Sequence, residues 1–455
     1  MTQPADEQRA FEAVRRYGYN VTSFQVLEPG FEYWFPTSGD GCVAYVDTGS
    51  AWVAAGAPLG AADQLAELTR QFLGAAAARR KRVCFFATEA RFFPAAEAAD
   101  LRSISIGEQP VWDPARWEES LRSSKSLREQ LRRARAKGVT IEQLTIEQLA
   151  DPSAAIRGEI EQLFASWLAA RPMAPMGFLV QLHAFSHFSD RRSFVARVEG
   201  RLVGFLGMVP VFGRDGWFIE DFLRVPSAPN GTAESLIDAA MRAGAREGAA
   251  FITLGLSPLA GPVRPILRVA ARLGSALYDF EGLRAFKAKL RPERWDPVFL
   301  SFPARSGSWL AIFDSLDAFA RGNLLGFGIE TLLRGPALVV RVLAVLLVPW
   351  ILALIAADAA HWFPATWIKW AWIAFDVVIA AALLRLSRDW IEPLGTLVAS
   401  AVSLDALLTA IEALLFNWPR VRSIPEGVVT VLAMLAPSLA ALVLWGGRLR
   451  ERSTS

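Results

Sequence analysis

The alternation of apolar and polar positions is clearest between residues 193 and 260, where it predicts a series of strands and one helix. The stretch SFVARVEGRLVGFLGMVPVF contains two apolar runs joined by Glu199-Gly200, and this pattern is typical of a β-hairpin. A third apolar run, WFIEDFLR, ends in the polar loop VPSAPNG. The stretch TAESLIDAAMRAGAREG then predicts a helix, and FITLGL predicts a short buried strand.

A similar order of elements is predicted earlier in the chain. Residues 31–56 form a meander of short apolar runs with turn residues between them, residues 62–78 predict a helix, and KRVCFFATE predicts a buried strand. Hairpin, strand, helix and strand is the order found in GNAT-type acyltransferases. We therefore predict an α/β (α+β) fold with tandem GNAT-like lobes, an N-terminal lobe at 20–150 and a catalytic lobe at 151–303.

The pattern changes after residue 303. Residues 304–335 are predicted to form an amphipathic connector that lies along a membrane surface with Phe and Leu toward the lipid. Residues 336–447 are predicted to form an all-α membrane domain, because each of four apolar runs is near the ~20 residues that a bilayer requires. These runs lie at 337–357, 366–385, 391–415 and 428–446.

Cationic residues near the ends of these runs predict how the chain crosses the membrane. Those on one side are Arg334, Arg385, Arg388, Arg448, Arg450 and Arg452. Those on the other side are Lys369, Arg420 and Arg422. This bias, with a start that lacks the apolar core of a signal peptide, predicts a multi-pass inner-membrane protein whose soluble part and both termini are cytoplasmic. Asp376, Asp405 and Glu412 lie within the runs, where carboxylates are costly and often functional.

Composition narrows the chemistry. The formal net charge of +3 is too small by itself to indicate nucleic-acid binding. Cys42 and Cys84 lie in apolar strand-like stretches, so two buried reduced thiols are favoured over a disulfide. No Cys/His cluster has the spacing of a zinc site. His183 and His187, four residues apart, are interpreted as packing or surface residues because no third ligand is visible.

One stretch between the lobes is strongly basic. The sequence WEESLRSSKSLREQLRRARAKG predicts a helix that ends at Gly138 and turns Leu121, Leu127 and Leu131 away from its cationic face. That face carries Lys125, Arg128, Arg132 and Arg135. It predicts a binding surface for phosphate groups of tRNA or of anionic lipids, although a solvated surface helix has the same pattern.

The candidate active-site residues lie where the third strand of the 193–260 unit ends and its loop begins. Glu220, Asp221 and Arg224 lie there, and strand ends often carry functional side chains. A structural salt bridge between Asp221 and Arg224 is the alternative. The loop VPSAPNG has two prolines, which lack N–H donors, so it is a poor cradle for the pyrophosphate of coenzyme A, and no cofactor is predicted.

Several motifs together resemble the catalytic domain of bacterial phosphatidylglycerol lysyl- and alanyltransferases, the multiple-peptide-resistance-factor type. They are GAPLG at 56–60, SLREQLRRARAKG at 126–138, EDFLRVPSAPNG at 220–231, LGLSPLAG at 254–261 and FEGLRAFKAKLRPERWDPVFLSFP at 280–303. The resemblance covers about residues 31–303. It implies transfer of an aminoacyl group from aminoacyl-tRNA to a membrane phospholipid such as phosphatidylglycerol, which adds positive charge and confers resistance to antimicrobial peptides.

By position, the resemblance implies that Asp221, Arg224 and Lys287 are catalytic. The residues expected to bind substrate are Glu220, Asn230, Gly231, Lys289 and the basic set Lys125, Arg128, Arg132 and Arg135. Asp221 would hold the α-ammonium of the donor, and Arg224 or Lys287 would stabilise the oxyanion. The alternative for Lys287 and Lys289 is a solvated strand edge on which both point the same way.

The chain departs from the known enzymes in one respect. In those enzymes a large membrane domain precedes the catalytic domain, whereas here the apolar runs follow it. Lipid flipping and the identity of the acceptor therefore stay open, as do homo-oligomerisation, an N-acyltransferase that uses an acyl carrier, and a non-catalytic relative that binds lipid or a partner.

Overall fold

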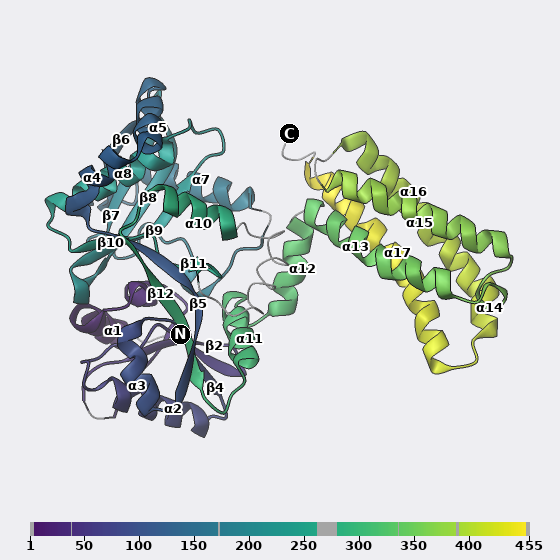
Figure 1. Cartoon of the computed structure of the whole chain (residues 1–455), viewed down its shortest axis with the longest axis horizontal. Coiled ribbons are helices and arrows are strands. Elements are labelled where there is room, and N and C mark those ends of the chain that lie inside the picture. The colour runs from purple at the N-terminus through teal and green to yellow at the C-terminus, as the bar shows by residue number, and fades with distance from the viewer. Residues whose placement is uncertain are drawn as a thin grey trace. The chain divides into compact units, whose positions relative to one another are not determined.

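A single mixed β-sheet runs through the first part of the chain, seen in the computed structural model (Figure 1). The structure describes residues 4–37, 39–171, 173–261, 280–334, 336–387 and 391–451. The strands are β1 (Glu32–Trp34), β2 (Val43–Asp47), β3 (Ala51–Ala55), β4 (Arg82–Thr88), β5 (Leu101–Trp112), β6 (Thr140–Gln143), β7 (Arg192–Val198), β8 (Arg201–Val211), β9 (Gly216–Arg224), β10 (Phe251–Thr253), β11 (Ser257–Pro258) and β12 (Arg294–Pro303). These bounds confirm the predicted meander, hairpin and later strands.

The order of the strands interlaces the two predicted lobes. Neighbours follow the order β1-β2-β3-β4-β12-β5-β10-β9-β8-β7-β6, with β11 paired to β5 off this path. The late strand β12 therefore lies between β4 and β5, and the early strand β6 pairs with β7. Residues 1–171 and 175–324 accordingly form one unit, and residues 172–174 and 325–455 form the other.

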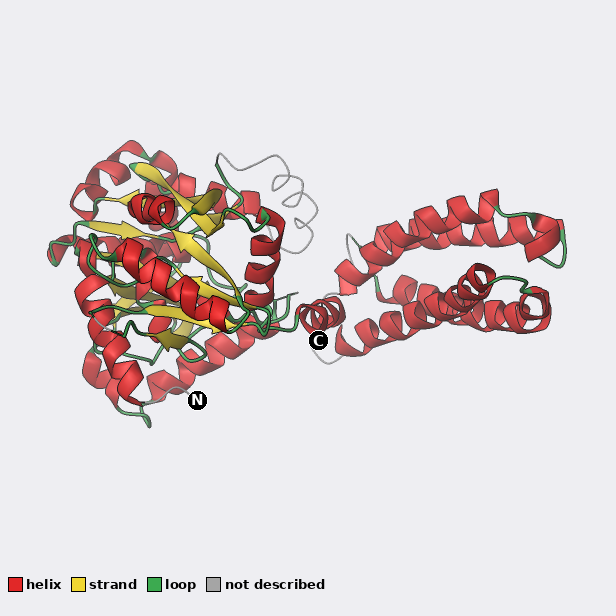
Figure 2. Cartoon of the chain, turned by 90° about the horizontal axis from the view of Figure 1, so that it is seen from below, coloured by secondary structure: helices red, strands yellow, loops and turns green. Residues whose placement is uncertain are grey.

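Helices cover both faces of the sheet (Figure 2). Those of the first unit are α1 (Pro4–Tyr17), α2 (Leu65–Ala78), α3 (Phe93–Ala98), α4 (Trp117–Ser123), α5 (Lys125–Ala136), α6 (Ile146–Ala150), α7 (Ala155–Ala169), α8 (Thr232–Arg246), α10 (Phe280–Lys289) and α11 (Ser308–Phe319). Short 3₁₀ turns include Gln25–Leu27 and Phe178–Val180. The mixed α/β class that the sequence predicts is thus confirmed.

The basic stretch forms two helices rather than the single helix that its sequence predicts. The chain breaks at Ser124, whose hydroxyl accepts a hydrogen bond from Leu127 N–H and so caps the start of α5. Leu121, Leu127 and Leu131 are buried as expected, and they pack with α8 in the core of the second half of the sheet. Cys42 and Cys84 are free and fully buried, which confirms the prediction for both thiols.

The second unit is helical. Its elements are α12 (Leu324–Arg334), α13 (Pro336–Ala356), α14 (Ala359–Trp362), α15 (Thr366–Leu386), α16 (Glu392–Glu412) and α17 (Ile424–Glu451). Among the described residues, three helical stretches are long and apolar enough to cross a membrane: Thr366–Leu386, Glu392–Arg420 and Glu426–Trp445. The first predicted span coincides with α13, whose apolar part is identified as the shorter Val342–Ala356.

Polar side chains of the second unit find partners inside it. Trp372 Nε1 donates to Glu412 Oε2 at 2.9 Å, and Thr409 donates to Asp405 at 3.1 Å. The ammonium group of Lys369 donates to the carbonyls of Ile355 and Ala357. Two residues used for the predicted orientation, Arg388 and Arg452, lie outside the described residues.

Candidate active site

A β-bulge in β9 brings two adjacent carboxylates to the same side of the sheet. Gly207 of β8 faces Asp221, but the next residue, Met208, faces Ile219, so Glu220 is an extra residue in β9. In a regular strand, consecutive side chains point to opposite faces. Because a bulge re-aims the side chains around it, both Glu220 and Asp221 approach one guanidinium group, that of Arg191.

Arg191 is the centre of a buried ionic cluster. Its Nη1 lies 2.6 Å from Glu220 Oε2 and 3.7 Å from Asp221 Oδ2, and its Nη2 pairs with Glu28. All four side chains are at most 5% exposed. Glu28 belongs to the predicted N-terminal lobe, so the cluster is assembled from both halves of the sequence. With all groups ionised, three carboxylates face one guanidinium.

This cluster has spare acceptor atoms. Among the described residues, Asp221 Oδ2 and Glu28 Oε2 are buried without a hydrogen-bond donor, and so is Ser193 Oγ. Ser193, Gly207 and Asp221 face one another across β7, β8 and β9, and Gly207 contributes no side chain between the other two. Buried acceptors without donors are rare in proteins, and such groups call for an explanation such as binding of a ligand.

The electrostatics of the cluster also favour the binding of a further cation. Burial and the neighbouring Glu220 hold the pKa of Asp221 well above its usual range, against the opposing effect of Arg191. Burial also raises the pKa of Glu220, although Arg191 acts in the opposite direction. One guanidinium is therefore too little positive charge for these carboxylates, and a second cation would stabilise their ionised forms.

Arg224 does not pair with Asp221, so the alternative of a structural salt bridge between them is wrong. Its side chain is exposed, and its Nη1 donates a long hydrogen bond of 3.4 Å to the carbonyl of Val225. The cation beside Asp221 is instead Arg191, at 3.7 Å, and the sequence predicts neither Arg191 nor Glu28 as a member of the site. Neither residue has a sequence signal, because an Arg before a strand and a Glu before a turn are common on surfaces.

Lys287 lies on helix α10, so the alternative of a solvated strand edge is wrong for it. Lys287 is only 4% exposed. Its Nζ donates to the carbonyls of Leu254, Gly255 and Leu256 at 2.8, 2.9 and 3.0 Å. These carbonyls directly follow β10, which runs parallel beside β9. Burial lowers the pKa of Lys287 to about 7. The three carbonyls favour the ammonium form and already accept from all three of its N–H groups.

The other predicted binding residues have separate surroundings. Lys289 ends α10 and pairs with Glu234 of α8 at 2.9 Å, so the two lysines do not share a face as they would on a strand. Asn230 is exposed. Gly231 is buried at the start of α8 with φ +95°, and a Cβ there would lie 2.1 Å from the carbonyl oxygen of Gln130 in α5. Gly231 thus permits close packing of α5 on α8.

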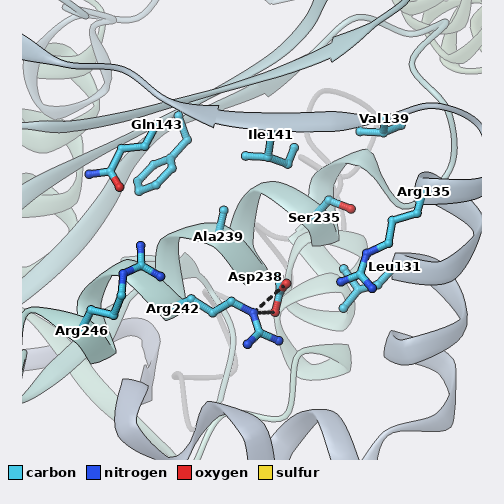
Figure 3. A pocket seen from close by; sticks show the side chains of 11 residues that line it. Leu131, Arg135, Val139, Ile141, Gln143, Ser235, Asp238, Ala239, Arg242 and Arg246 are labelled. Carbon is cyan, nitrogen blue, oxygen red and sulfur yellow. Dashed lines mark hydrogen bonds and ion pairs between the residues drawn. The ribbon is translucent and has the colours of Figure 1, made fainter.

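The basic residues of α5 are all exposed but differ in their partners. Arg132 pairs with Glu129 at 2.9 Å, and Arg128 donates to the carbonyl of Leu121 at 2.8 Å. Arg135 instead borders a pocket of about 410 Å³ between α5, β6 and α8 (Figure 3). The lining residues are Leu131, Arg135, Val139, Ile141, Gln143, Phe194, Ser235, Asp238, Ala239, Arg242 and Arg246.

The pocket combines an apolar floor with a cationic rim. Arg242 Nε donates to both carboxylate oxygens of Asp238 at 3.1 Å and its Nη1 pairs with Glu118, so these three groups together carry one negative charge. Arg135 and Arg246 have no ion pair among the described residues and add two positive charges. Figure 3 shows Arg135 reaching the hollow from α5 and Arg246 from α8. Guanidinium groups from two elements around one hollow suit a phosphate ester.

Within the described part of the chain, no three His, Cys, Asp or Glu side chains are placed to hold a metal ion. His187 stacks on Phe11 with ring centroids 5.4 Å apart, and His183 lies 3.8 Å from Glu28. The buried acceptors of the cluster around Arg191 are separate oxygen atoms, and an organic ammonium group has several N–H donors that match such a set.

Comparison with known proteins gives one family. The family model described as "Phosphatidylglycerol lysyltransferase, C-terminal" matches residues 11–302. Phosphatidylglycerol lysyltransferase of Bacillus subtilis is 27% identical over 154 residues, which are 32% of this chain and 18% of the relative. Phosphatidylglycerol lysyltransferase of Staphylococcus haemolyticus is 21% identical over 319 residues, which are 68% of this chain and 37% of the relative. The chain spans less than two fifths of the length of the curated relatives it matches.

Two solved structures share the fold. One is named as the C-terminal domain of a lysylphosphatidylglycerol synthetase from Agrobacterium fabrum, with a TM-score of 0.60 and 25% identity, and it covers 70% of this chain and 97% of its own. The other, named L-PGS from Bacillus licheniformis, has a TM-score of 0.60 and 21% identity, and it covers 70% of this chain and 98% of its own. The second likeness concerns the fold alone.

Proposed function

Because the chain belongs to the family of phosphatidylglycerol lysyltransferase C-terminal domains, we propose that it is a membrane-bound aminoacyltransferase. It takes an aminoacyl group from aminoacyl-tRNA and transfers it to the hydroxyl of a membrane lipid such as phosphatidylglycerol. The observation that carries this proposal is the buried cluster around Arg191, which has three carboxylates, one guanidinium and acceptors without donors.

The missing cation is the α-ammonium of the aminoacyl donor. Asp221 Oδ2 accepts one of its N–H groups, and Ser193 Oγ, one strand pairing beyond Gly207, offers a further acceptor. The ammonium then supplies the charge that the carboxylates lack. An ester without a free α-amine, such as an N-acylated aminoacyl-tRNA, would leave these acceptors unpaired, so the site favours donors with a free amine.

The transfer itself is an ester exchange. The lipid hydroxyl oxygen attacks the carbonyl carbon of the donor ester, the bond from that carbon to the ribose oxygen breaks, and the hydroxyl proton moves to the departing ribose oxygen. Arg224 is exposed at the end of β9 and has N–H groups to donate to the developing oxyanion. Lys287, whose three donors are engaged, is a positioning residue that holds the segment after β10 beside the bulge.

The pocket between α5 and α8 is proposed to bind the tRNA backbone. Arg135 and Arg246 would contact one phosphate, and the exposed Lys125 and Arg128 would follow the backbone along α5. Such contacts release counterions, so binding should weaken steeply with salt. For the variant Arg135→Gln/Arg246→Gln we expect higher KM for tRNA and a shallower salt dependence. Lys137→Gln, an exposed cation outside the pocket, is the matched control.

The helical unit is proposed to span the inner membrane. The three long apolar helices support membrane association, and α13 would add the fourth span. With an even number of spans, the first unit and the C-terminus lie on the same side. The cationic residues near the spans support a cytoplasmic location for that side, where charged tRNA is found.

A reconstitution assay tests the function directly. The full chain, purified and placed in phosphatidylglycerol vesicles, is supplied with aminoacyl-tRNA that carries a labelled amino acid. We expect label in the lipid fraction, none when the amine is acetylated, and little with Asp221→Asn. Transfer from an acyl-carrier thioester but not from aminoacyl-tRNA would contradict the proposal and favour the N-acyltransferase.

A further inference from the structure

Helix α11 carries four large apolar side chains on the side that faces away from the sheet, where a helix that only covers a core would be polar. The fully buried residues of the side that faces the sheet are small or polar, namely Ala311, Asp314, Ser315 and Ala318, and the half-buried Ile312 and Phe319 complete its contact with the core. The outer side carries Trp309, Leu310, Phe313 and Leu316, with exposed fractions of 70, 44, 42 and 51%. Residues 309, 313 and 316 follow helical spacing, so the exposed residues form one continuous apolar face.

The inner side of α11 is held firmly, so this orientation is specified by the sequence. Arg82 of β4 binds Asp314 through two hydrogen bonds, Nε to Oδ2 at 2.9 Å and Nη2 to Oδ1 at 2.5 Å. The hydroxyl of Ser315 donates to the carbonyl of Ala311 and lies 3.7 Å from Cys84 Sγ. A half-turn rotation of α11 would break this ion pair and turn Trp309 toward the sheet in place of Asp314 and Ser315.

Exposed apolar residues are concentrated on this helix. Of the seven large apolar side chains exposed among the described residues up to 324, four lie on α11. A fifth, Val180, belongs to the turn Phe178–Val180, which packs against the end of α11 through an edge-to-face contact of the Phe178 and Phe319 rings, 5.3 Å apart. Contiguous apolar patches of this kind mark interaction sites on soluble surfaces.

We propose that α11 is an interfacial helix and that its outer face is inserted among the headgroups and upper acyl chains of a phospholipid bilayer. The chain itself argues for this occupant, because only sixteen residues separate Phe319 from α13 and the apolar helices that follow. The exposed Arg305 and Arg321 flank α11 at its two ends. Cations beside an aromatic and aliphatic face are typical of helices that lie on anionic membranes.

The placement of a single probe on α11 tests this in the full chain. Phe313→Cys is labelled with a fluorophore after reconstitution into phosphatidylglycerol-containing vesicles, and Ala136→Cys on the exposed end of α5 is the matched control. Cys42 and Cys84 are fully buried and should not react in the folded protein. Quenching is then compared between a doxyl group carried on lipid chains and iodide in the water.

We expect strong quenching by the lipid-borne doxyl group and weak quenching by iodide at position 313, and the reverse at position 136. Equal iodide quenching at the two positions would overturn the proposal. Protection of position 313 from both quenchers would also overturn it, because protein would then cover the face. In that case energy transfer between labelled copies would identify a second copy, and its absence would identify helices of the same chain. None of these outcomes depends on the enzymatic activity.

Discussion

Asp221→Asn should abolish transfer without destabilising the protein, and this combination separates a substrate site from a structural ion pair. Asp221 Oδ2 lies 3.7 Å from Arg191 Nη1, and an effective dielectric constant of 20 gives an attraction of about 4 kcal/mol between unit charges at that distance. The raised pKa of Asp221 shows that burial and the repulsion from Glu220 outweigh this attraction. The isosteric, neutral Asn therefore removes a net unfavourable charge.

We expect the free energy of unfolding at pH 7 to be unchanged or higher in Asp221→Asn, with no loss beyond about 0.5 kcal/mol. The pH dependence of folding stability tests independently whether the charge on Asp221 is unfavourable. A carboxyl whose pKa is raised by folding stabilises the protein below its unfolded pKa and loses that contribution as pH rises through the folded value. The wild type should therefore lose stability relative to Asp221→Asn as pH increases above about 4.

The assay pairs thermal unfolding, followed by near-ultraviolet circular dichroism of the full chain in detergent, with labelled transfer to lipid. Loss of a buried, charged hydrogen-bond acceptor for the α-ammonium should lower kcat/KM by about 10²–10³-fold, since such contacts are worth about 3–4 kcal/mol. Asp314→Asn is the matched control, because Asp314 is equally buried and binds Arg82. It should lose about 1–2 kcal/mol of stability and keep its specific activity.

The reasoning is refuted if Asp221→Asn unfolds at a lower temperature and its activity falls only in proportion to the folded fraction. That result would make Asp221 a structural partner of Arg191. Arg191→Gln completes the comparison, because it leaves three buried carboxylates without a cation and should destabilise the protein by about 3–5 kcal/mol.

Two further predictions concern Lys287 and Gly231. Folding lowers the pKa of Lys287 to about 7. The free energy of unfolding of the wild type should therefore rise relative to that of Lys287→Met between about pH 7 and 10, by at most about 1.4 kcal/mol per pH unit. A difference that does not change with pH would show that the carbonyl groups keep the lysine charged. Gly231→Ala places a Cβ 2.1 Å from Gln130 O at a positive φ. It should lower the free energy of unfolding by about 1–3 kcal/mol and weaken tRNA binding, because α5 must shift. Unchanged stability and unchanged tRNA affinity would contradict the packing argument.

The sequence predicts most of the strands and helices because their apolar periodicity is strong, and it places Glu220, Asp221 and Arg224 together at the end of β9. It does not predict the partners of those residues. Only the bulge at Glu220 brings two consecutive carboxylates to Arg191, and a bulge leaves no trace in the apolar pattern. The alternative of a strand edge for Lys287 and Lys289 is wrong because both lie on helix α10, and alternating apolar and cationic residues over so few positions are compatible with a short helix as well as a strand.

The position of β12 has a consequence for how the protein is made. This strand, residues 294–303, fills the gap between β4 and β5, so translation must pass residue 303 before the sheet can close. Until then, both inner edges present unpaired N–H and carbonyl groups, which are prone to association with other chains. The apolar helices leave the ribosome soon afterwards, so closure of the sheet competes in time with membrane insertion. Slowing translation just after residue 303 should therefore raise the yield of folded protein, whereas truncation before residue 294 should produce an aggregating chain.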